Sequence, residues 1–400
     1  MERLWNSNYW KVMIANFSMT FAFYLLTPLL PLYLTETYNS SKDMVGLVLS
    51  GYAITALIVR PFSGYLTDSF PRKRVLLLGL FLYFIFFGGY LAAGSLLMFA
   101  IVRTLHGAPF GTASVANSTA AIDVLPSSRR TEGIGYYGLS NNLATAIAPT
   151  IGVFIYKYLH DFNILFWLAF IVAGVGFVVD ATIKMPEKQI IKTGKTLSLD
   201  RFFLLRGWML GVNIIFFGTC YGVLSNYLAI YGKEVMGITG GTGAFFMLLS
   251  IGLMLSRLQG AKSLRKGLLT QSAAQGILIS TVGYLLFVSC PNMVGYYGSA
   301  LLIGLGNGHM WPAFQNMIIG IAMNNERGTA NSTILTSWDM GVGIGILAGG
   351  VIVEYFNYST AFWWIAVVHL LGAALYFLLT RKSYLINKAA KEAEILSKTR

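Results

Sequence analysis

Long apolar stretches recur along the whole chain, and short polar segments separate them. A helix of about 20 apolar residues is long enough to cross the ~30 Å hydrocarbon core of a bilayer. The pattern therefore predicts an all-α membrane protein. We expect twelve transmembrane helices, at 12–35, 44–67, 74–94, 97–122, 133–158, 161–183, 206–231, 243–259, 267–289, 294–322, 328–355 and 359–380.

The charges add an orientation to these helices. Only 11% of residues are charged, against about 25% in soluble domains, and the net charge is +13. If the N-terminus is cytoplasmic, the loops on the opposite side hold only Lys42, Lys157 and Lys233 of the 29 Lys and Arg residues. The positive-inside rule then places both termini in the cytoplasm. We interpret the excess of Lys and Arg as a mark of the cytoplasmic side and as a contact with anionic lipid of the bilayer. We expect no nucleic-acid partner.

The longest internal polar stretch, at about 184–206, divides the predicted helices into two groups of six. We predict a six-helix half at 1–183, a cytoplasmic linker at 184–205, a second six-helix half at 206–382 and a cytoplasmic tail at 383–400. Identical residues recur at an offset of 197: Arg60 and Arg257, Gly107 and Gly304, Gly111 and Gly308, Arg130 and Arg327, Gly152 and Gly349, Tyr158 and Tyr355. Two pseudo-symmetric halves in one orientation are the layout of a secondary transporter with parallel repeats.

The segment "GYLTDSFPRKR", residues 64–74, concentrates charge and turn residues between the second and third predicted helices. It resembles the loop signature of the major facilitator superfamily. The matching residues are Gly64, Leu66, Asp68, Arg72 and Lys73, whereas Ser69 and Pro71 depart from the signature. The resemblance implies the twelve-helix fold of that family and a transport function.

Two further segments resemble motifs of the same family. "RTLHGAPFG" in the fourth helix matches at Arg103 and Gly107, with His106 where glutamine is usual. "ATAIAPTIG" in the fifth helix matches at Pro149 and Gly152, but Ala144, Ala148 and Val153 replace glycines. These motifs point to the drug/proton antiporter branch, which carries out multidrug or sugar efflux. The resemblance implies the proton gradient as energy source and no cofactor.

We expect the charged loop to form a conformational gate, made by Gly64, Asp68, Arg72, Asp123 and Arg60. Gly64 allows close helix approach, and Asp68 can accept hydrogen bonds from the free N–H groups at the start of a neighbouring helix. Asp123 is the other acid within reach of Arg60 and Arg72. The simpler interpretation, that cations here only mark the cytoplasmic side, suits Lys73 and Arg74 better than it suits an acid.

Polar residues inside the apolar helices are the candidates for transport chemistry. A charge within a membrane span is expensive and faces the bundle interior or water. We predict proton coupling by Asp339, Arg103, His106 and His309, with static hydrogen-bonding roles as the alternative. The predicted substrate cavity combines small polar and aromatic residues: Asn16, Thr20, Phe23, Thr27, Phe110, Ser114, Asn117, Asn142, Phe217, Tyr221, Asn316 and Thr336. Plain packing is the alternative for each aromatic ring.

Pro149 and Gly152 predict a bend in the fifth helix, because proline removes a backbone hydrogen bond. Other functions find little support. "KTGKT" in the linker lacks the first glycine of a phosphate-binding loop, and the histidines have no acid partner at helical spacing, so we expect neither an ATP-driven pump nor an enzyme. No zinc motif occurs in the sequence.

We therefore expect proton-coupled export of a small amphipathic compound by alternating access. The alternative is proton-coupled uptake of a nutrient such as a sugar, carboxylate or peptide, and a membrane receptor or enzyme ranks third. The expected protein is a monomer in a bacterial inner membrane, with a small molecule, protons and the lipid bilayer as its partners.

Overall fold

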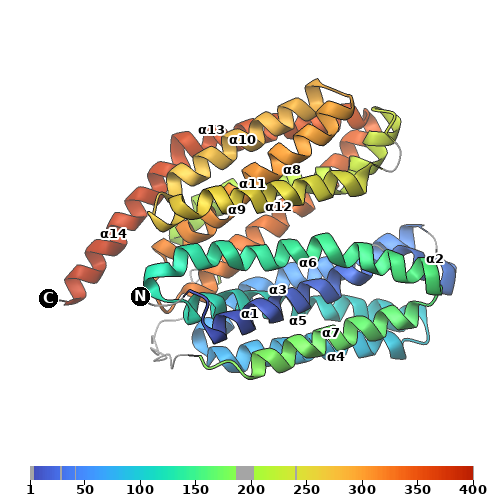
Figure 1. Cartoon of the computed structure of the whole chain (residues 1–400), viewed down its shortest axis with the longest axis horizontal. Helices are drawn as coiled ribbons and strands as arrows, with labels where there is room; N and C mark the ends of the chain where they lie inside the picture. The colour runs from blue at the N-terminus through green and yellow to red at the C-terminus, as the bar shows by residue number, and fades with distance from the viewer. Residues whose placement is uncertain (1–3, 28, 41, 186–201, 239–240, 400) are drawn as a thin grey trace. The chain divides into compact units, whose positions relative to one another are not determined.

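The structure is a computed structural model that describes residues 4–27, 29–40, 42–185, 202–238 and 241–399 (Figure 1). These residues are almost entirely helical, and none of them lies in a β-strand. Eight of the described helices are long and apolar enough to cross a membrane. Most of the predicted linker at 184–205 lies outside the described residues.

The helices follow one another along the whole chain. Their bounds are α1 (Ser7–Leu26), α2 (Leu30–Tyr38), α3 (Lys42–Ser69), α4 (Arg72–Ala92), α5 (Leu96–Val124), α6 (Arg130–Leu159), α7 (Phe162–Ala181), α8 (Trp208–Glu234), α9 (Thr242–Arg265), α10 (Leu269–Ser289), α11 (Met293–Ile321), α12 (Arg327–Tyr355), α13 (Tyr358–Leu375) and α14 (Arg381–Thr399). Short 3₁₀ turns precede α6 and α8, at Ser127–Arg129 and Leu205–Gly207, and a π-helical turn, η4 (Tyr376–Thr380), joins α13 to α14.

The chain divides into two compact units. Unit 1 consists of Met1–Phe202 together with Asn325–Ser332, and unit 2 consists of Phe203–Asn324 together with Thr333–Arg400. The first turns of α12 therefore pack in unit 1, whereas the remainder of that helix belongs to unit 2.

Side-chain caps fix where several helices begin. The Ser95 hydroxyl accepts a hydrogen bond from the backbone N–H of Met98 at the start of α5 (3.2 Å), and the Asn292 side chain accepts one from Gly295 N–H at the start of α11 (2.9 Å). Such caps satisfy backbone N–H groups that have no partner within the helix. Ser95 and Asn292 are themselves 197 residues apart.

The same offset of 197 separates whole helices. α4 and α10 begin and end 197 residues apart, at Arg72 and Leu269 and at Ala92 and Ser289, and the same holds for α5 and α11. The repeat that the sequence predicts is therefore present in the register of the backbone.

A close helix crossing is also repeated. A Cβ atom on Gly107 in α5 would collide with the carbonyl oxygen of Tyr52 in α3, and a Cβ atom on Gly304 in α11 would collide with the carbonyl oxygen of Leu249 in α9. Tyr52 and Leu249 are 197 residues apart, like the two glycines. Each unit thus needs glycine at the same crossing, because the facing backbone occupies the space of a side chain.

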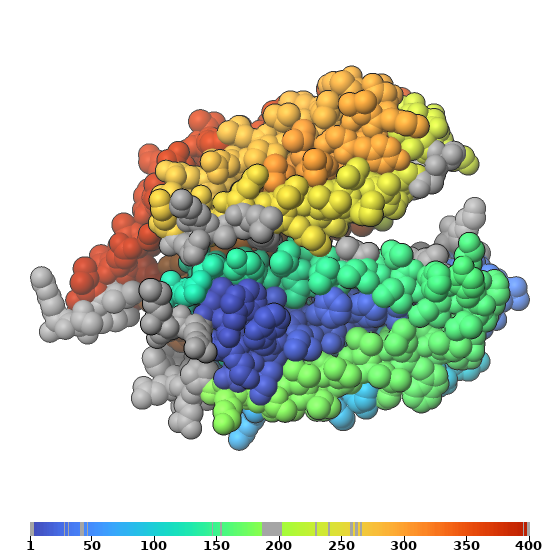
Figure 2. Space-filling view, viewed as in Figure 1, coloured from blue at the N-terminus to red at the C-terminus, as the bar shows by residue number. Residues whose placement is uncertain are grey.

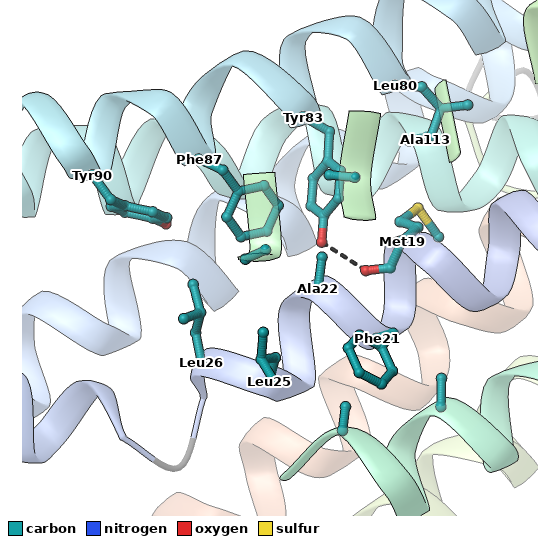
Figure 3. Packing of buried hydrophobic residues seen from close by; sticks show 14 of the residues in the cluster. Met19, Phe21, Ala22, Leu25, Leu26, Leu80, Tyr83, Phe87, Tyr90 and Ala113 are labelled. Carbon is teal, nitrogen blue, oxygen red and sulfur yellow. Dashed lines mark hydrogen bonds between the residues drawn. The ribbon is translucent and has the colours of Figure 1, made fainter. Parts of the chain in front are cut away.

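The core of unit 1 lies between α1, α4, α5 and α7. Figure 3 shows Tyr83 of α4 directed toward α1, where its hydroxyl donates to the Met19 carbonyl oxygen over 2.8 Å, next to Ala22 and Phe87. Figure 2 shows the side chains of α1, α6 and α7 packed side by side on one face of this unit, in agreement with the contacts between these helices.

Unit 2 has a separate aromatic core. The ring of Tyr231 in α8 packs on Phe362 in α13 at a centroid distance of 4.3 Å, and Phe287 and Tyr296 close the cluster from α10 and α11. A hydrogen bond from the Asn213 amide to the Gly372 carbonyl (2.8 Å) ties α8 to α13 at the other end of the unit.

The prediction of one continuous first helix at 12–35 is wrong. The structure has α1 ending at Leu26 and a separate α2 beginning at Leu30. Pro31 stands in the first turn of α2, where its missing N–H costs nothing, and the same residue within a continuous helix would remove a backbone hydrogen bond. The hydropathy pattern does not indicate this break, because α1 and α2 are both apolar.

Candidate functional site

Arg103 lies inside unit 1, on α5. Its side chain is buried, at 5% exposure, and the guanidinium carbon lies 4.2 Å from the ring centroid of Tyr52 and 5.6 Å from that of Phe23. One guanidinium nitrogen donates to the Tyr90 hydroxyl over 3.3 Å. A cation stacked on aromatic faces is stabilised by about 0.5–2 kcal/mol, which offsets part of the cost of its burial.

His106 joins this group one turn further along α5. Its Nδ1 atom lies 2.8 Å from the Tyr90 hydroxyl, so one phenol contacts both the imidazole and the guanidinium of Arg103. The rings of Tyr83 and Phe87 each lie 4.7 Å from the imidazole. His106 is fully buried, and its Nε2 atom has no hydrogen-bond partner in the part of the chain that the structure describes.

Two predicted cavity residues complete the arrangement. Phe23 of α1 stacks on Phe110 of α5 at 5.2 Å, and Phe23 also stacks on Tyr52 at 5.1 Å. We call the group of Arg103, His106, Tyr52, Tyr90, Phe23 and Phe110 the Arg103 cluster. It combines one cation, one imidazole and several ring faces, a set that can bind an anionic group next to an apolar one.

Two polar residues of α1 form hydrogen bonds with α6, and a third polar residue follows the helix. The Asn16 amide donates to the Ser140 hydroxyl (2.7 Å) and its oxygen accepts from the Tyr137 hydroxyl (2.8 Å), while the Thr20 hydroxyl donates to Asn141. The Thr27 hydroxyl donates to the Phe23 carbonyl of its own helix (2.7 Å). These bonds give Asn16, Thr20 and Thr27 structural roles in addition to the predicted cavity role.

Three other predicted cavity residues of unit 1 lie on α5 and α6. The Ser114 hydroxyl donates to the Gly111 carbonyl of its own helix (2.9 Å), and Asn142 is half-buried in α6. Asn117 is fully buried, and neither its oxygen nor its nitrogen has a hydrogen-bond partner among the described residues. A buried amide without partners is costly, so Asn117 is a site where a polar ligand group or water would be stabilised.

The remaining predicted residues lie in unit 2. Asp339 and Thr336 are half-buried in α12, and His309 is buried in α11, where its carbonyl accepts from Ser272 (3.4 Å). The Asn316 amide donates to the Pro312 carbonyl of α11 (2.7 Å). In α8, Phe217 packs on His369 at 5.0 Å and Tyr221 packs on Trp338 at 5.4 Å. Arg103 and His106 are thus brought together in unit 1, whereas Asp339 and His309 belong to unit 2.

The predicted gate residues surround the first turn of α12. Both carboxylate oxygens of Asp68 cap this helix: one accepts from the backbone N–H of Gly328 (3.0 Å), and the other from the backbone N–H (2.8 Å) and hydroxyl (3.0 Å) of Thr329. An anion at a helix N-terminus is favoured by the helix dipole and by the N–H groups of the first turn, which have no acceptor within their own helix.

A second acid completes this contact. Asp123 of α5 pairs with Arg72 of α4 and with Arg327 at the start of α12, the latter over 2.9 Å, and Arg72 also reaches Asp68 at 3.2 Å. We call these residues together with Gly328 and Thr329 the Asp68 cluster. Its charges alternate in sign, and its side chains are largely withdrawn from solvent.

Gly64 and Arg60 extend the contact along α3. A Cβ atom on Gly64 would lie 2.6 Å from the Cβ atom of Ser332 and 3.0 Å from the Gly328 carbonyl oxygen. The Ser332 hydroxyl donates to the Arg60 carbonyl over 2.5 Å, and the Arg60 guanidinium lies 5.8 Å from the Phe110 ring. Backbone contact between α3 and the start of α12 therefore needs glycine at position 64.

Pro149 lies within α6, which runs as one helix from Arg130 to Leu159. Three residues on, a Cβ atom at Gly152 would collide with the carbonyl oxygen of Leu25, so α6 approaches the backbone of α1 closely here. The structure thus gives Gly152 a packing role, and the predicted bend at Pro149 stays a prediction.

Several residues near these sites are not indicated by the sequence. Tyr52 and Tyr90 contact Arg103, but they are ordinary aromatic residues of apolar helices in the sequence. Asp180 at the end of α7 is fully buried, and neither of its carboxylate oxygens has a partner among the residues described. The isolated acid in "VGFVVDA" is the signal that could have found it. Nearby, Lys11 and Lys73 donate to the Thr182 and Ile183 carbonyls and cap α7.

Within the described residues, no three His, Cys, Asp or Glu side chains are grouped so that they could hold a metal ion. The Arg103 cluster and the Asp68 cluster are the two groups in unit 1 that bring together residues predicted from the sequence.

Comparisons with known proteins identify the family of the chain. The family model of the Major Facilitator Superfamily matches residues 12–308 and, in a second match, residues 272–399. The quinolone resistance protein NorA of Staphylococcus aureus (strain MRSA252) is 22% identical over 82% of this chain and 86% of its own length.

Solved structures of low sequence identity share the fold. The human organic anion transporter MFSD10 (TETRAN) matches with a TM-score of 0.79 and 16% identity, over 92% of this chain and 99% of that one. The transporter FucP in the outward conformation matches with a TM-score of 0.76 and 17% identity, over 94% of this chain and 99% of that one.

Proposed function

Because the chain belongs to the Major Facilitator Superfamily, a family of secondary transporters, we propose that it exports a small amphipathic compound in exchange for protons. The family membership and the all-α, multi-pass membrane fold confirm the resemblance found in the sequence. Members of this family are in general transporters and not enzymes. The similarity to a quinolone resistance protein supports the export of a drug-like compound.

The Arg103 cluster is the observation that carries the proposal. A guanidinium inside a membrane span needs a functional or structural reason, because its burial is expensive. The Nε atom of Arg103 is buried without a hydrogen-bond partner among the described residues, so this donor is available to an acceptor group of a ligand. The rings of Phe23, Phe110 and Tyr52 supply apolar contact beside that donor.

The proton-coupling role rests on the sequence. Asp339 is the acid well inside an apolar helix of the second half, and its half-buried position in α12 is compatible with exchange of a proton with water. His106 and His309 are the titratable residues that could share this task. We propose the proton gradient as the only energy source, without a cofactor.

The Asp68 cluster is proposed as the gate of the transport cycle. Its hydrogen bonds hold the start of α12 against α3, and they must break if this contact opens in alternating access. Because a gate residue acts on the conformational change and not on the bound substrate, Asp68→Asn is expected to lower turnover and leave substrate affinity nearly unchanged. A large loss of substrate binding would show instead that Asp68 belongs to the binding site.

The cell context is part of the proposal. Bacterial relatives support a location in a bacterial plasma membrane, and the distribution of cations supports cytoplasmic termini. We propose that the monomer is the working unit, since each chain carries both halves.

The proposal is tested with purified protein in two steps. A thermal-shift screen of amphipathic compounds first finds ligands that stabilise the fold. Arg103→Lys keeps the charge but loses the planar stack on Tyr52, and we expect it to weaken ligand binding roughly tenfold. Tyr52→Phe is the matched control, because it keeps the ring face and removes only a hydroxyl that has no partner among the described residues.

Transport in proteoliposomes is the second step. An imposed proton gradient is expected to drive the ligand across the membrane in the direction opposite to that of the protons. Asp339→Asn is expected to abolish this coupling while ligand binding remains. Coupled transport that survives this substitution unchanged would remove Asp339 from the mechanism. Movement of ligand and protons in the same direction would replace export by nutrient uptake as the function.

A further inference from the structure

The last helix of unit 2 continues beyond the length needed to cross a membrane. α13, η4 and α14 contain 18, 5 and 19 residues and follow one another without a break. At 1.5 Å per residue they extend about 60 Å, roughly twice the hydrocarbon thickness of a bilayer. Figure 1 shows α14 leaving the other helices of its unit. α14 therefore lies at or beyond the membrane surface.

One side of α14 packs on unit 2 and fixes the rotation of the helix. Tyr384 is buried, and Lys391 donates to the Gly320 carbonyl at the end of α11 over 2.8 Å. Tyr384, Asn387 and Lys391 are spaced by three and four residues, so they share one face. The side chains of α14 that face the protein are thus polar or amphipathic.

The opposite side of α14 is apolar and exposed. Leu385, Ile386 and Leu396 are exposed by 49%, 59% and 66%, and Ala389, Ala390 and Ala393 lie on the same stripe. A surface helix of a soluble protein normally turns its apolar stripe toward the core, and α14 does the reverse. An outward apolar stripe of this length requires an apolar environment.

This stripe continues a surface that faces lipid. Leu378 and Leu379 of η4 are exposed at the end of the spanning segment, and Leu385 and Ile386 follow them after seven residues, on the same side of the helix. Since the exposed leucines of a spanning helix contact acyl chains, the same environment is the simplest one for the residues that extend their stripe.

The charges of α14 fit an anionic surface. Residues 381–399 contain Arg381, Lys382, Lys388, Lys391 and Lys398 but only two acids, Glu392 and Glu394. Lys382 also borders a groove of about 250 Å³ between the start of α8 and α14, where Met209, Leu379 and Ile386 are the apolar lining residues. A basic helix with an apolar stripe is the form in which proteins lie in the headgroup region of a membrane.

We propose that α14 is an interfacial helix that binds anionic phospholipid of the leaflet where α13 ends. The apolar stripe enters the boundary of the acyl chains, and Lys382 and Lys388 contact the phosphate headgroups. The face with Tyr384 and Lys391 stays on the protein, which holds the stripe toward the membrane.

The test uses the full-length protein with Cys220 and Cys290 replaced by alanine and a single spin label introduced by Ala393→Cys or by Lys388→Cys. Oxygen partitions into acyl chains and a nickel chelate stays in water. In nanodiscs with phosphatidylglycerol, the label at 393 is expected to be relaxed mainly by oxygen and the label at 388 mainly by nickel. In nanodiscs of phosphatidylcholine alone, this difference is expected to shrink.

Charge variants identify the role of anionic lipid. With the label at 393, Lys382→Gln is expected to lower the ratio of membrane-bound to free α14 roughly fivefold in phosphatidylglycerol nanodiscs. Lys157→Gln, at the end of α6, is the matched control and should change nothing. A label at 393 that is equally accessible to nickel in both lipids overturns the proposal. Protection from both reagents, with spin–spin broadening, would show instead that a second copy of the chain covers the stripe.

Discussion

Asp68→Asn changes the carboxylate that caps the start of α12. The two carboxylate oxygens of Asp68 accept bonds from Gly328 N–H, from Thr329 N–H and hydroxyl, and from Arg72. The asparagine amide has one oxygen and one NH₂ group, so one of the two positions becomes a donor that faces at least one N–H donor. That bond is lost, and the remaining bonds lose their charged acceptor.

The expected magnitude follows from these bonds. A hydrogen bond to a charged group contributes about 1.5–3 kcal/mol, and removal of one partner from a buried charge network costs about 3–5 kcal/mol. We therefore expect the contact between α3 and the start of α12 to weaken by about 3–4 kcal/mol. Because 1.4 kcal/mol corresponds to a factor of ten, the open population rises roughly 100- to 1,000-fold.

The assay uses Thr67→Cys in a background without Cys220 and Cys290. Thr67 is fully buried, and its Cβ atom lies 3.0 Å from the position of a Cβ on Gly328, so a thiol there reacts only when α12 moves away. The labelling rate with a small maleimide then reports the open population. Asp68→Asn should raise this rate by the factor given above.

Asp161→Asn is the control for this substitution. Asp161 caps α7 through the Asn163 N–H, and asparagine caps a helix as well as aspartate does, so Asp161→Asn should leave the labelling rate unchanged. A change below about threefold for Asp68→Asn, equivalent to well under 1 kcal/mol, would refute the idea that Asp68 holds this contact.

Three further substitutions test separate parts of the structure by thermal unfolding. Gly64→Ala should destabilise the protein by about 1–3 kcal/mol through overpacking against Ser332, whereas Gly343→Ala, with open space around it, should be neutral or stabilising; equal effects would contradict the assigned contact. Gly304→Ala should lower the unfolding temperature because its Cβ meets the backbone of α9, and an unchanged temperature would argue against that crossing. Asp180→Asn should leave the unfolding temperature unchanged or higher, because the carboxylate has no hydrogen bond among the described residues to lose; a large drop would be evidence of a partner.

The sequence predicts the frame of this fold well, because that frame depends on local patterns. Apolar runs locate most helices to within a few residues, and the offset between Gly107 and Gly304 anticipates the duplicated helix crossing. The break between α1 and α2 escaped notice because it depends on the position of Pro31 within an apolar run and not on hydropathy.

The sequence does not predict which residues the candidate site residues contact. The sequence predicts that Asp68 caps a neighbouring helix, but only tertiary structure shows that this helix is α12, some 260 residues away. The cavity role of Asn16 stays a prediction, and the structure adds a hydrogen bond from its amide to the Ser140 hydroxyl of α6, which the sequence does not indicate. Tyr52 and Tyr90 are identified as site residues only by their contacts with the Arg103 guanidinium. An aromatic residue in a spanning helix does not by itself indicate a functional site.

The duplicated glycine crossing has a consequence for how the two units can differ. What Gly107 and Gly304 touch is backbone, the carbonyls of Tyr52 and Leu249, so the side chains around each crossing are unconstrained by it. The positions that correspond to Arg103 and His106 in the second repeat are Ala300 and Ile303. The two crossings can therefore stay in register although a cation and an imidazole occur beside only one of them, and this difference between the units needs no change of fold.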